Sequence, residues 1–167
     1  GKAIVFDIFP CLAGGGYFYD FTRTWCLGYA PDEIQEAYNQ VKSVYDQVVS
    51  ELELGVHAAS YQERTCELFE EMGHATIRQN PAIEEGYIHS LGHGLGLNVH
   101  EKPWFGRKED PTNNLRIGSV FTIEPGLYYP GIGFGIRLED SWYVAEDGSF
   151  HKFVDYPMEL VVPMKGS

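Results

Sequence analysis

The chain has 167 residues, and this length predicts a single domain with a substantial buried core. Its 24 acidic and 12 basic residues give a formal net charge of −12, which argues against nucleic acid and anionic membrane surfaces as partners. The apolar content of 44% is typical of a soluble globular protein, and no segment approaches the roughly 20 apolar residues of a membrane span. Three cysteines without a Cys-x-x-Cys motif indicate a reducing compartment, so we expect a cytoplasmic protein.

Two predicted strands near the N-terminus each carry a carboxylate. Residues 3–8 form a short apolar run interrupted by Asp7, and residues 17–24 alternate aromatic and polar side chains and include Asp20. The glycines at 14–16 are a turn signal, so the two strands are predicted to form a hairpin. A buried carboxylate without a partner is costly, and we therefore expect a cation nearby.

Two helices are predicted to follow the hairpin. The first spans residues 31–54, with a proline in its first turn and a continuous apolar stripe on one side. The second has Ser60 as N-cap, Glu63 completing a capping box, and its end near Gly73. Three histidines outside the central motif are predicted to be solvated surface residues: His57, His74 and His151.

The segment 88–101 contains half of the chain's six histidines, His89, His93 and His100, interleaved with glycines. Glycine lets the backbone approach a bound ion or ligand closely, as in a ligand-binding loop. Periodicity alone does not bring the three imidazoles together, because His100 falls on the opposite face of a straight strand. A structural role for any one of these histidines is the simpler interpretation until their surroundings are considered.

The C-terminal part repeats the pairing of acidic residues seen at the N-terminus. Residues 120–124 are predicted to form a strand that ends in a Pro-Gly turn, and residues 135–140 form a second strand with Arg137 and Glu139 on one face. Glu124 and Glu139 are therefore a second carboxylate pair. Two hairpins with acidic residues, one on each side of the histidine segment, suggest two similar halves facing each other across a site.

Between the histidine segment and this second pair, residues 101–118 contain two prolines and mixed charge and are predicted to form a loop that walls the pocket. Trp104 and Phe105 either line a substrate subsite or anchor the loop by packing. The sequence alone leaves both interpretations open.

Four carboxylates and one imidazole are the candidate metal ligands: Asp7, Asp20, His93, Glu124 and Glu139. Clustered carboxylates repel one another and their pKa values rise, whereas two divalent cations would neutralise four charges. Oxygen-rich ligation with one nitrogen suits Mn²⁺, Co²⁺, Fe²⁺ or Zn²⁺, and a pair of metals roughly 3.5 to 4 Å apart is a known arrangement for activating water.

The chain resembles the pita-bread metallopeptidases, which include Xaa-Pro dipeptidase (prolidase), aminopeptidase P and methionine aminopeptidase. The resemblance spans residues 3–145 and rests on six short segments: Asp7; Asp20-Phe-Thr-Arg-Thr; His89-Ser-Leu-Gly-His93-Gly-Leu-Gly; Val99-His100-Glu101; Thr122-Ile-Glu124-Pro-Gly; and Arg137-Leu-Glu139-Asp140. It implies an α+β pita-bread fold, in which helices cover the outer face of a curved antiparallel sheet, and it implies a homodimer.

The same resemblance assigns metal ligands residue by residue. Asp7 would hold one metal, His93 and Glu124 the other, and Asp20 and Glu139 would bridge the two. We expect Mn²⁺ at both positions, with Co²⁺, Zn²⁺ and Fe²⁺ as alternatives.

Catalytic roles also follow from the resemblance. A hydroxide shared by the metals would attack the scissile carbonyl, and Glu124 would shuttle the proton. His89 and His100 would hold the substrate and its oxyanion, and Arg137 is counted with these catalytic residues. Donors aimed at a developing oxyanion are typically worth about 2.7 to 4 kcal/mol each.

The last motif, Arg137-Leu-Glu139-Asp140, together with His89, is similar to the Xaa-Pro enzymes, whereas methionine aminopeptidases have Gln-Phe-Glu there. We therefore expect a dinuclear exopeptidase that hydrolyses Xaa-Pro bonds in proline-containing peptides. A methionine-aminopeptidase-like enzyme and a catalytically silent or incomplete binding module are the alternatives.

The silent or incomplete module is an alternative because family members carry substantial sequence before the first metal aspartate. The N-terminal part of the family domain is therefore expected to be absent here. The opening Asp7-Ile-Phe also departs from the commoner Asp-Xaa-Gly.

Overall fold

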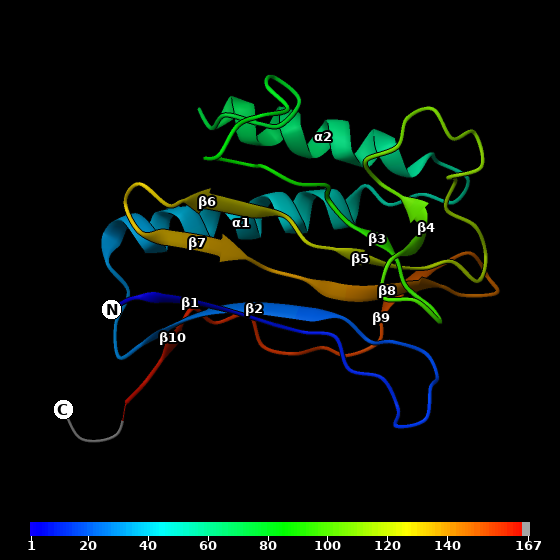
Figure 1. Ribbon diagram of the computed structural model, residues 1–167, viewed down its shortest axis with the longest axis horizontal. Coiled ribbons are helices and arrows are strands. Elements are labelled where there is room, and N and C mark those ends of the chain that lie inside the picture. The colour runs from blue at the N-terminus through cyan, green and yellow to red at the C-terminus, as the bar shows by residue number, and fades with distance from the viewer. Residues whose placement is uncertain (165–167) are drawn as a thin grey trace.

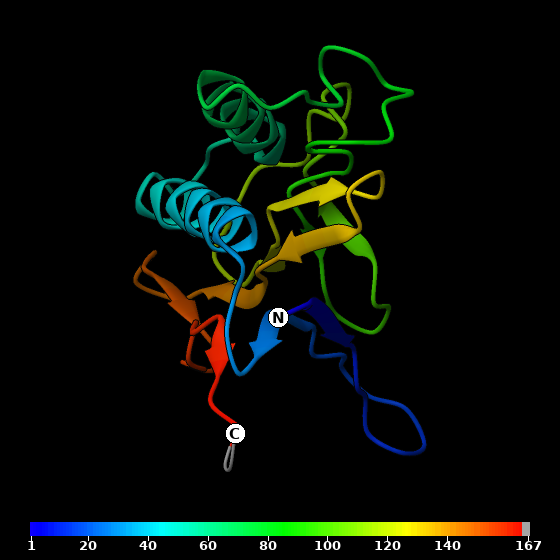
Figure 2. The ribbon, with the colours of Figure 1, turned by 90° about the vertical axis from the view of Figure 1, so that its left-hand side faces the viewer.

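The computed structural model describes residues 1–164, which form two helices and ten strands. The helices are α1 (Asp32–Ser50) and α2 (Ala58–Glu71). The strands are β1 (Ala3–Ile8), β2 (Phe21–Leu27), β3 (His93–Gly94), β4 (Glu101–Trp104), β5 (Val120–Ile123), β6 (Gly126–Tyr129), β7 (Phe134–Arg137), β8 (Asp140–Val144), β9 (Phe150–Lys152) and β10 (Val161–Val162). Both helices lie on the same side of the strands (Figures 1 and 2). Neither helix of the described part has the length and apolar character that a membrane crossing requires.

The N-terminal hairpin is confirmed. Strands β1 and β2 pair antiparallel with Asp7 opposite Thr22, and the loop between them contains Gly14 and Gly15 with positive φ angles of 92° and 101°. The second strand begins four residues later than predicted, because the backbone of residues 17–19 bonds elsewhere. The amide of Phe18 donates to the carbonyl of Gly96, in the histidine segment, at 2.8 Å. Strand β10 then joins β2 in parallel, giving the sheet order β1-β2-β10.

The second acidic pair lies between two successive antiparallel strand pairs, β5 with β8 and β6 with β7. Strands β5 and β8 belong to a five-stranded sheet of order β4-β3-β5-β8-β9, and β6 pairs with β7 beyond it. Glu124 and Glu139 lie between these ladders, after β5 and before β8. The predicted turn at Pro125-Gly126 is wrong, because Gly126 pairs with Arg137 and the chain reverses at residues 130–133 instead. The predicted strand 135–140 is correspondingly divided between β7 and β8.

Both helices exist, but their ends differ from the prediction. Helix α1 stops at Ser50, four residues before the predicted end, and its predicted apolar stripe is buried. Helix α2 begins at Ala58 rather than after Ser60, because the imidazole of His57 caps it by accepting a hydrogen bond from the amide of Ala59 at 3.2 Å. His57 and His74 were wrongly assigned to the solvated surface. His74 is half-buried, and its ring bonds to side chains of β6 and α1, namely Tyr129 and Gln40.

The predicted loop 101–118 contains β4 and is anchored by its aromatic residues. Phe105 is completely buried and its ring packs beside those of Tyr61 and Phe121. The guanidinium of Arg107 lies 4.3 Å from the ring centre of Trp104. Neither Trp104 nor Phe105 lines the cavity that holds the candidate ligands, so the anchoring interpretation describes them better than a substrate subsite.

A buried ion pair joins the two acidic hairpins. The guanidinium of Arg23 donates to Asp140 at 2.7 Å, with both side chains 1% exposed, and it also donates to the backbone carbonyl of Glu139 at 2.7 Å. The other carboxylate oxygen of Asp140 accepts from the hydroxyl of Tyr45, on α1, at 2.6 Å. Arg23 on β2 and Tyr45 on α1 therefore both bind the start of β8, immediately after Glu139.

Replacing the cation of this pair should destabilise the protein strongly. We expect Arg23→Met to lower the free energy of unfolding by about 3 to 5 kcal/mol. It leaves the buried Asp140 charge with only the hydroxyl of Tyr45 and the more distant ammonium of Lys152, 3.9 Å away. Urea denaturation measures the change, and Arg116→Met, at an exposed position, is the matched control. A loss below about 1 kcal/mol, as for a surface pair, would contradict this account.

Candidate metal centre

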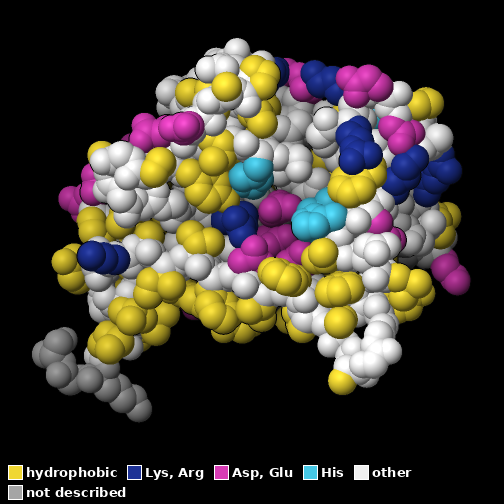
Figure 3. Space-filling model, viewed as in Figure 1, with side chains coloured by type: hydrophobic (Ala, Val, Ile, Leu, Met, Phe, Trp, Pro, Cys, Tyr) yellow, Lys and Arg dark blue, Asp and Glu magenta, His cyan; other side chains and the backbone are white. Residues whose placement is uncertain are grey.

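A small cavity of about 110 Å³ gathers the predicted ligands from both hairpins and from the histidine segment. It is lined by Asp7, Phe9, Asp20, His93, Val99, His100, Glu124 and Glu139. All five predicted metal ligands are thus brought to one place. In the space-filling view, acidic side chains and histidines meet in a hollow near the centre of one face (Figure 3).

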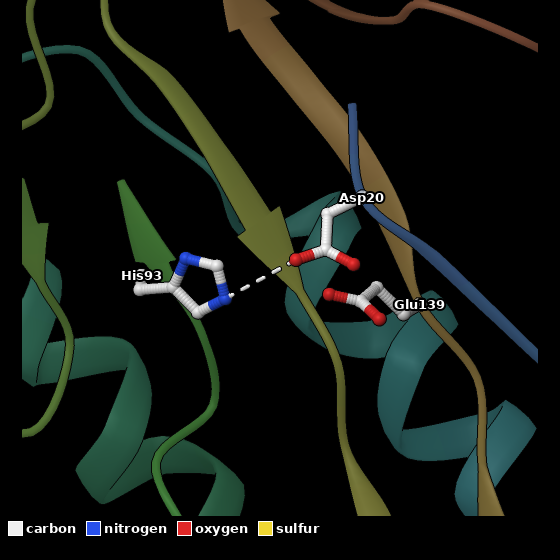
Figure 4. Close-up of side chains that lie close together, drawn as sticks. All are labelled: Asp20, His93 and Glu139. Atoms are coloured by element: carbon white, nitrogen blue, oxygen red, sulfur yellow. Dashed lines mark ion pairs between the residues drawn. The ribbon is translucent and has the colours of Figure 1, made fainter. Parts of the chain in front are cut away.

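Three of these residues form the innermost cluster. One ligand atom from each of Asp20, His93 and Glu139 lies within 4.8 Å of the other two, and all three residues are buried. The side chains point toward one another (Figure 4). Asp20 and Glu139 are neighbours because Thr22 and Glu139 form an antiparallel bridge, in which the amide of Glu139 donates to the carbonyl of Thr22 at 3.0 Å.

The ring of His93 has the orientation that a metal ligand would need. Its Nδ1 lies 3.0 Å from the carbonyl oxygen of Gly94, which can only accept, so Nδ1 carries the proton and donates. Its Nε2 therefore presents a lone pair, 3.7 Å from Oδ2 of Asp20 and 3.4 Å from Oε1 of Glu124. Burial, with the charge of His100 adding to it, lowers the pKa of His93 to about 4, so the ring is neutral at pH 7. A lone pair that faces two carboxylates is favourable with a carboxyl proton or a metal cation between them, and a backbone carbonyl on the other ring nitrogen is typical of metal-binding histidine.

The carboxylates show the electrostatic cost of the cavity without cations. Burial, reinforced by the charge of Asp7, raises the pKa of Asp20 to about 6. Burial likewise raises the pKa of Glu124 to about 8, although the Arg137 guanidinium opposes the shift. The pKa of Glu139 is raised well above its ordinary value by burial and then by the charges of Glu124 and Asp20. These donors fit divalent cations, which would replace the protons that the carboxylates otherwise hold.

Asp7 lines the cavity but lies outside the innermost cluster. Its carboxylate forms an ion pair with Nη2 of Arg137. Arg137 also donates from Nε to the hydroxyl of Thr22 at 3.2 Å and from Nη1 to the hydroxyl of Tyr128 at 3.0 Å, and its Nε lies 4.0 Å from Glu124. Arg137 therefore contacts acidic residues of both hairpins, and a metal ion bound by Asp7 would compete with it.

The other two histidines occupy different positions. His100 is exposed and lines the cavity, with its ring centre 4.2 Å from that of His93, because the segment bends and does not continue as a straight strand. His89 does not line the cavity. Its Nδ1 donates to the carbonyl of Ser90 at 2.8 Å, so its Nε2 accepts from the hydroxyl of Tyr128 at 2.9 Å. Burial lowers the pKa of His89 to about 4.

Three residues that the sequence interpretation did not select support the site: two bond to candidate ligands, and the third bonds to their neighbours. The hydroxyl of Thr22 donates to Glu139 at 2.5 Å, that of Thr122 donates to Glu124 at 3.3 Å, and Tyr128 links Arg137 to His89. The two threonines lie two positions from Asp20 and Glu124, so they share a strand face with an acidic residue. That spacing is a usable signal for Thr22 and Thr122, whereas nothing in the sequence around Tyr128 indicates its two partners.

The architecture together with this donor set is that of the pita-bread metallopeptidases. The sequence matches Peptidase_M24, metallopeptidase family M24, over residues 1–146. It is 33% identical over 162 residues to "Probable dipeptidase PepE" of Mycobacterium bovis, covering 97% of this chain and 40% of that protein. It is also 33% identical over 133 residues to the Xaa-Pro dipeptidase of Pyrococcus furiosus, covering 80% of this chain and 35% of that protein.

The fold comparison agrees. The crystal structure of X-Pro aminopeptidase from Thermotoga maritima MSB8 superimposes with a TM-score of 0.79 and 30% identity, covering 96% of this chain and 42% of that one. The chain belongs to metallopeptidase family M24, and the expected pita-bread fold is confirmed. The chain spans about 40% of the length of the first of these relatives.

Proposed function

We propose that residues 1–167 form a single catalytic domain of a metal-dependent exopeptidase, which binds two divalent ions and hydrolyses Xaa-Pro bonds. Asp7 would hold one ion, His93 and Glu124 the other, and Asp20 and Glu139 both. The observation that carries the proposal is the lone pair of His93, fixed by Gly94 and aimed at two carboxylates 3.4 and 3.7 Å away. Membership of a metallopeptidase family and similarity to proteins named Xaa-Pro dipeptidase support the reaction and substrate.

The chain's own groups have distinct roles in this proposal. Bound divalent metal would supply a water nucleophile at neutral pH and charge stabilisation for the oxyanion. Glu124 would accept the proton and pass it to the leaving amine, since its carboxylate lines the cavity beside the proposed ions. His100, exposed at the cavity, would contact the substrate. His89 would contact the substrate only after its Nε2 leaves the hydroxyl of Tyr128, 2.9 Å away. Arg137 would neutralise negative charge between the two hairpins.

The decisive experiment combines metal loading with three substrates. We expect the chain to bind two Mn²⁺ or Co²⁺ and then to hydrolyse a Xaa-Pro dipeptide or a Xaa-Pro-Xaa tripeptide, and to leave a Met-Ala peptide intact. Chelation should abolish turnover. Cleavage of the Met-Ala peptide alone would indicate a methionine-aminopeptidase-like enzyme. Two bound ions without turnover of any peptide would overturn the peptidase proposal in favour of a metal-binding module.

Thr22 offers a graded test of the metal site. We expect Thr22→Val to weaken metal binding by about 10- to 100-fold, as is typical for loss of a hydrogen-bond partner of a ligand. The hydroxyl of Thr22 orients Glu139 and opposes the rise of its pKa, and valine keeps the shape without the donor. Isothermal titration with Mn²⁺ measures the effect, and Thr22→Ser should bind normally. Equal affinity for the valine and serine variants would show that the hydroxyl does not matter.

Three further features are part of the proposal. Mn²⁺ is the expected ion because four carboxylates and one imidazole form a hard donor set without thiolate. A homodimer and a cytoplasmic location are also expected. Analytical ultracentrifugation tests the dimer, and a monomer at every concentration would remove that expectation without affecting the metal site.

A further inference from the structure

Gln62, on α2, is a buried polar residue whose hydrogen-bonding capacity is fully used. Its Oε1 accepts from the amide of Leu91 at 2.5 Å and from the hydroxyl of Tyr87 at 2.9 Å. Its Nε2 donates to the backbone carbonyl of His89 at 3.3 Å and to the sulfur of Cys66 at 3.7 Å. Gln62 is 7% exposed, and three of these four contacts reach the segment 87–91.

That segment is irregular, although Tyr87 and Leu91 are buried in the core and the backbone of Tyr87 also bonds to Ala75 and Ile77. It precedes β3, and its backbone is not part of a strand ladder between Tyr87 and His93. Figure 1 shows the chain running beneath α2 before it enters β3. On the side away from α2, the carbonyl of Leu91 accepts from the amide of Glu124 at 2.7 Å. The backbone of Leu91 therefore connects Gln62 on one side to Glu124 on the other.

The position of the His89 imidazole depends on the same segment. Gln62 holds the His89 carbonyl, while the ring lies between the carbonyl of Ser90 and the hydroxyl of Tyr128. The hydroxyl of Tyr128 in turn accepts from Arg137. A shift of this backbone would move the His89 ring off Tyr128 and release the amide of Glu124. If position 62 served packing alone, an apolar side chain would suit it better than Gln62, because an apolar side chain has no buried polar atoms that need partners.

We propose that Gln62 is a positioning residue, which clamps the segment 87–91 so that the Leu91 carbonyl fixes the backbone of Glu124 and the His89 ring stays on Tyr128. The effect on turnover rests on the proposed function, whereas the clamp itself does not. It acts from a second layer, because Gln62 does not line the cavity of the candidate metal ligands.

The test compares Gln62→Leu and Gln62→Glu with a control on the same helix. Thr65→Val is matched, since Thr65 is also buried on α2 but its hydroxyl bonds to the helix carbonyl of Tyr61 at 2.8 Å. In the metal-free protein, we expect Gln62→Leu to lose at least about 10-fold of the hydrogen-exchange protection of the Leu91 amide and to change the His89 ring nitrogen shifts. Thr65→Val should alter neither signal.

Gln62→Glu adds a pH-dependent readout that loss of packing would not produce. A protonated glutamic acid reproduces one accepting oxygen and one donor toward the His89 carbonyl, whereas its carboxylate repels that carbonyl. The Leu91 amide keeps its acceptor in both forms. The His89 ring nitrogen shifts should therefore match those of wild type at low pH and diverge from them as the new carboxyl ionises, because only the contact with the His89 carbonyl is lost. In the Mn²⁺-loaded enzyme, Gln62→Leu should reduce kcat by about 10- to 100-fold, with KM within about threefold and two ions still bound.

Unchanged Leu91 protection and unchanged His89 shifts in folded Gln62→Leu would overturn the proposal. If Gln62→Leu does not fold, the pH dependence of Gln62→Glu decides, and His89 nitrogen shifts equal to those of wild type at every pH would count against the clamp. A wild-type chain without peptidase activity would overturn the proposed function only, because the exchange and nitrogen-shift measurements need neither metal nor substrate.

Discussion

Glu139→Gln should abolish binding of the second metal ion and reduce hydrolysis by at least about 100-fold, more than the loss of a supporting hydrogen bond usually causes. Glu139 is 2% exposed and lies in the innermost cluster with Asp20 and His93. It is the candidate bridge from the second hairpin, so its loss would remove a ligand from both ions at once. Glutamine keeps the size and the bond from Thr22 but cannot supply the negative charge.

Elemental analysis of the loaded protein gives the stoichiometry, which we expect to fall from two ions to one or none. Asp20→Asn should have the same effect, since Asp20 is the other proposed bridge. The matched control is Glu146→Gln, an exposed glutamate between β8 and β9, which should bind two ions and retain activity. Two ions bound to Glu139→Gln with unchanged affinity would refute the bridging assignment.

The sequence predicted the components of this site better than their connections. Asp20 and Glu139 were recognisable because a carboxylate within or beside an apolar strand needs a partner. Their proximity was not derivable from local pattern, because it depends on the bridge between Thr22 and Glu139, 117 residues apart. The ion pair of Asp7 with Arg137 is likewise a contact between distant strands, which no local spacing reveals.

The errors in the fold have physical causes of the same kind. A Pro-Gly pair favours a turn locally, yet Gly126 pairs with Arg137 and the ribbon continues past Pro125. A serine and a glutamate at capping-box spacing predict a helix start, but His57 supplies the cap three residues earlier. At Gly126 the cross-strand pairing outweighed the local turn preference. At His57 the carbonyl of Asp110, 2.7 Å from Nε2, holds the ring in the tautomer whose Nδ1 accepts from Ala59.

Glu124→Gln should have opposite effects on metal-free stability and on function. Burial raises the pKa of Glu124 from 4.5 to about 8, so between these values the folded state binds more protons than the unfolded state. The free energy of unfolding of the metal-free chain must then fall as pH rises from about 4.5 toward 8. At pH 7 this one group lowers the free energy of unfolding by about 3 kcal/mol relative to its value near pH 4. Glutamine stays neutral, so the variant should be more stable than wild type at pH 7 and about equal to it near pH 4.

Urea denaturation of both chains in the presence of a chelator, at pH 4, 6 and 8, measures the difference. Asp20 and Glu139 remain titratable in the variant, so its stability should still decline with pH, but less steeply. Added Mn²⁺ should reverse the order, because only wild type keeps the full ligand set, and its stabilisation grows with the ratio of free metal to Kd. A variant less stable than wild type at pH 7 without metal would mean that Glu124 is held in place by favourable contacts. In that case repulsion among the buried carboxylates would not destabilise the metal-free cavity, and a cation would not be needed to offset it.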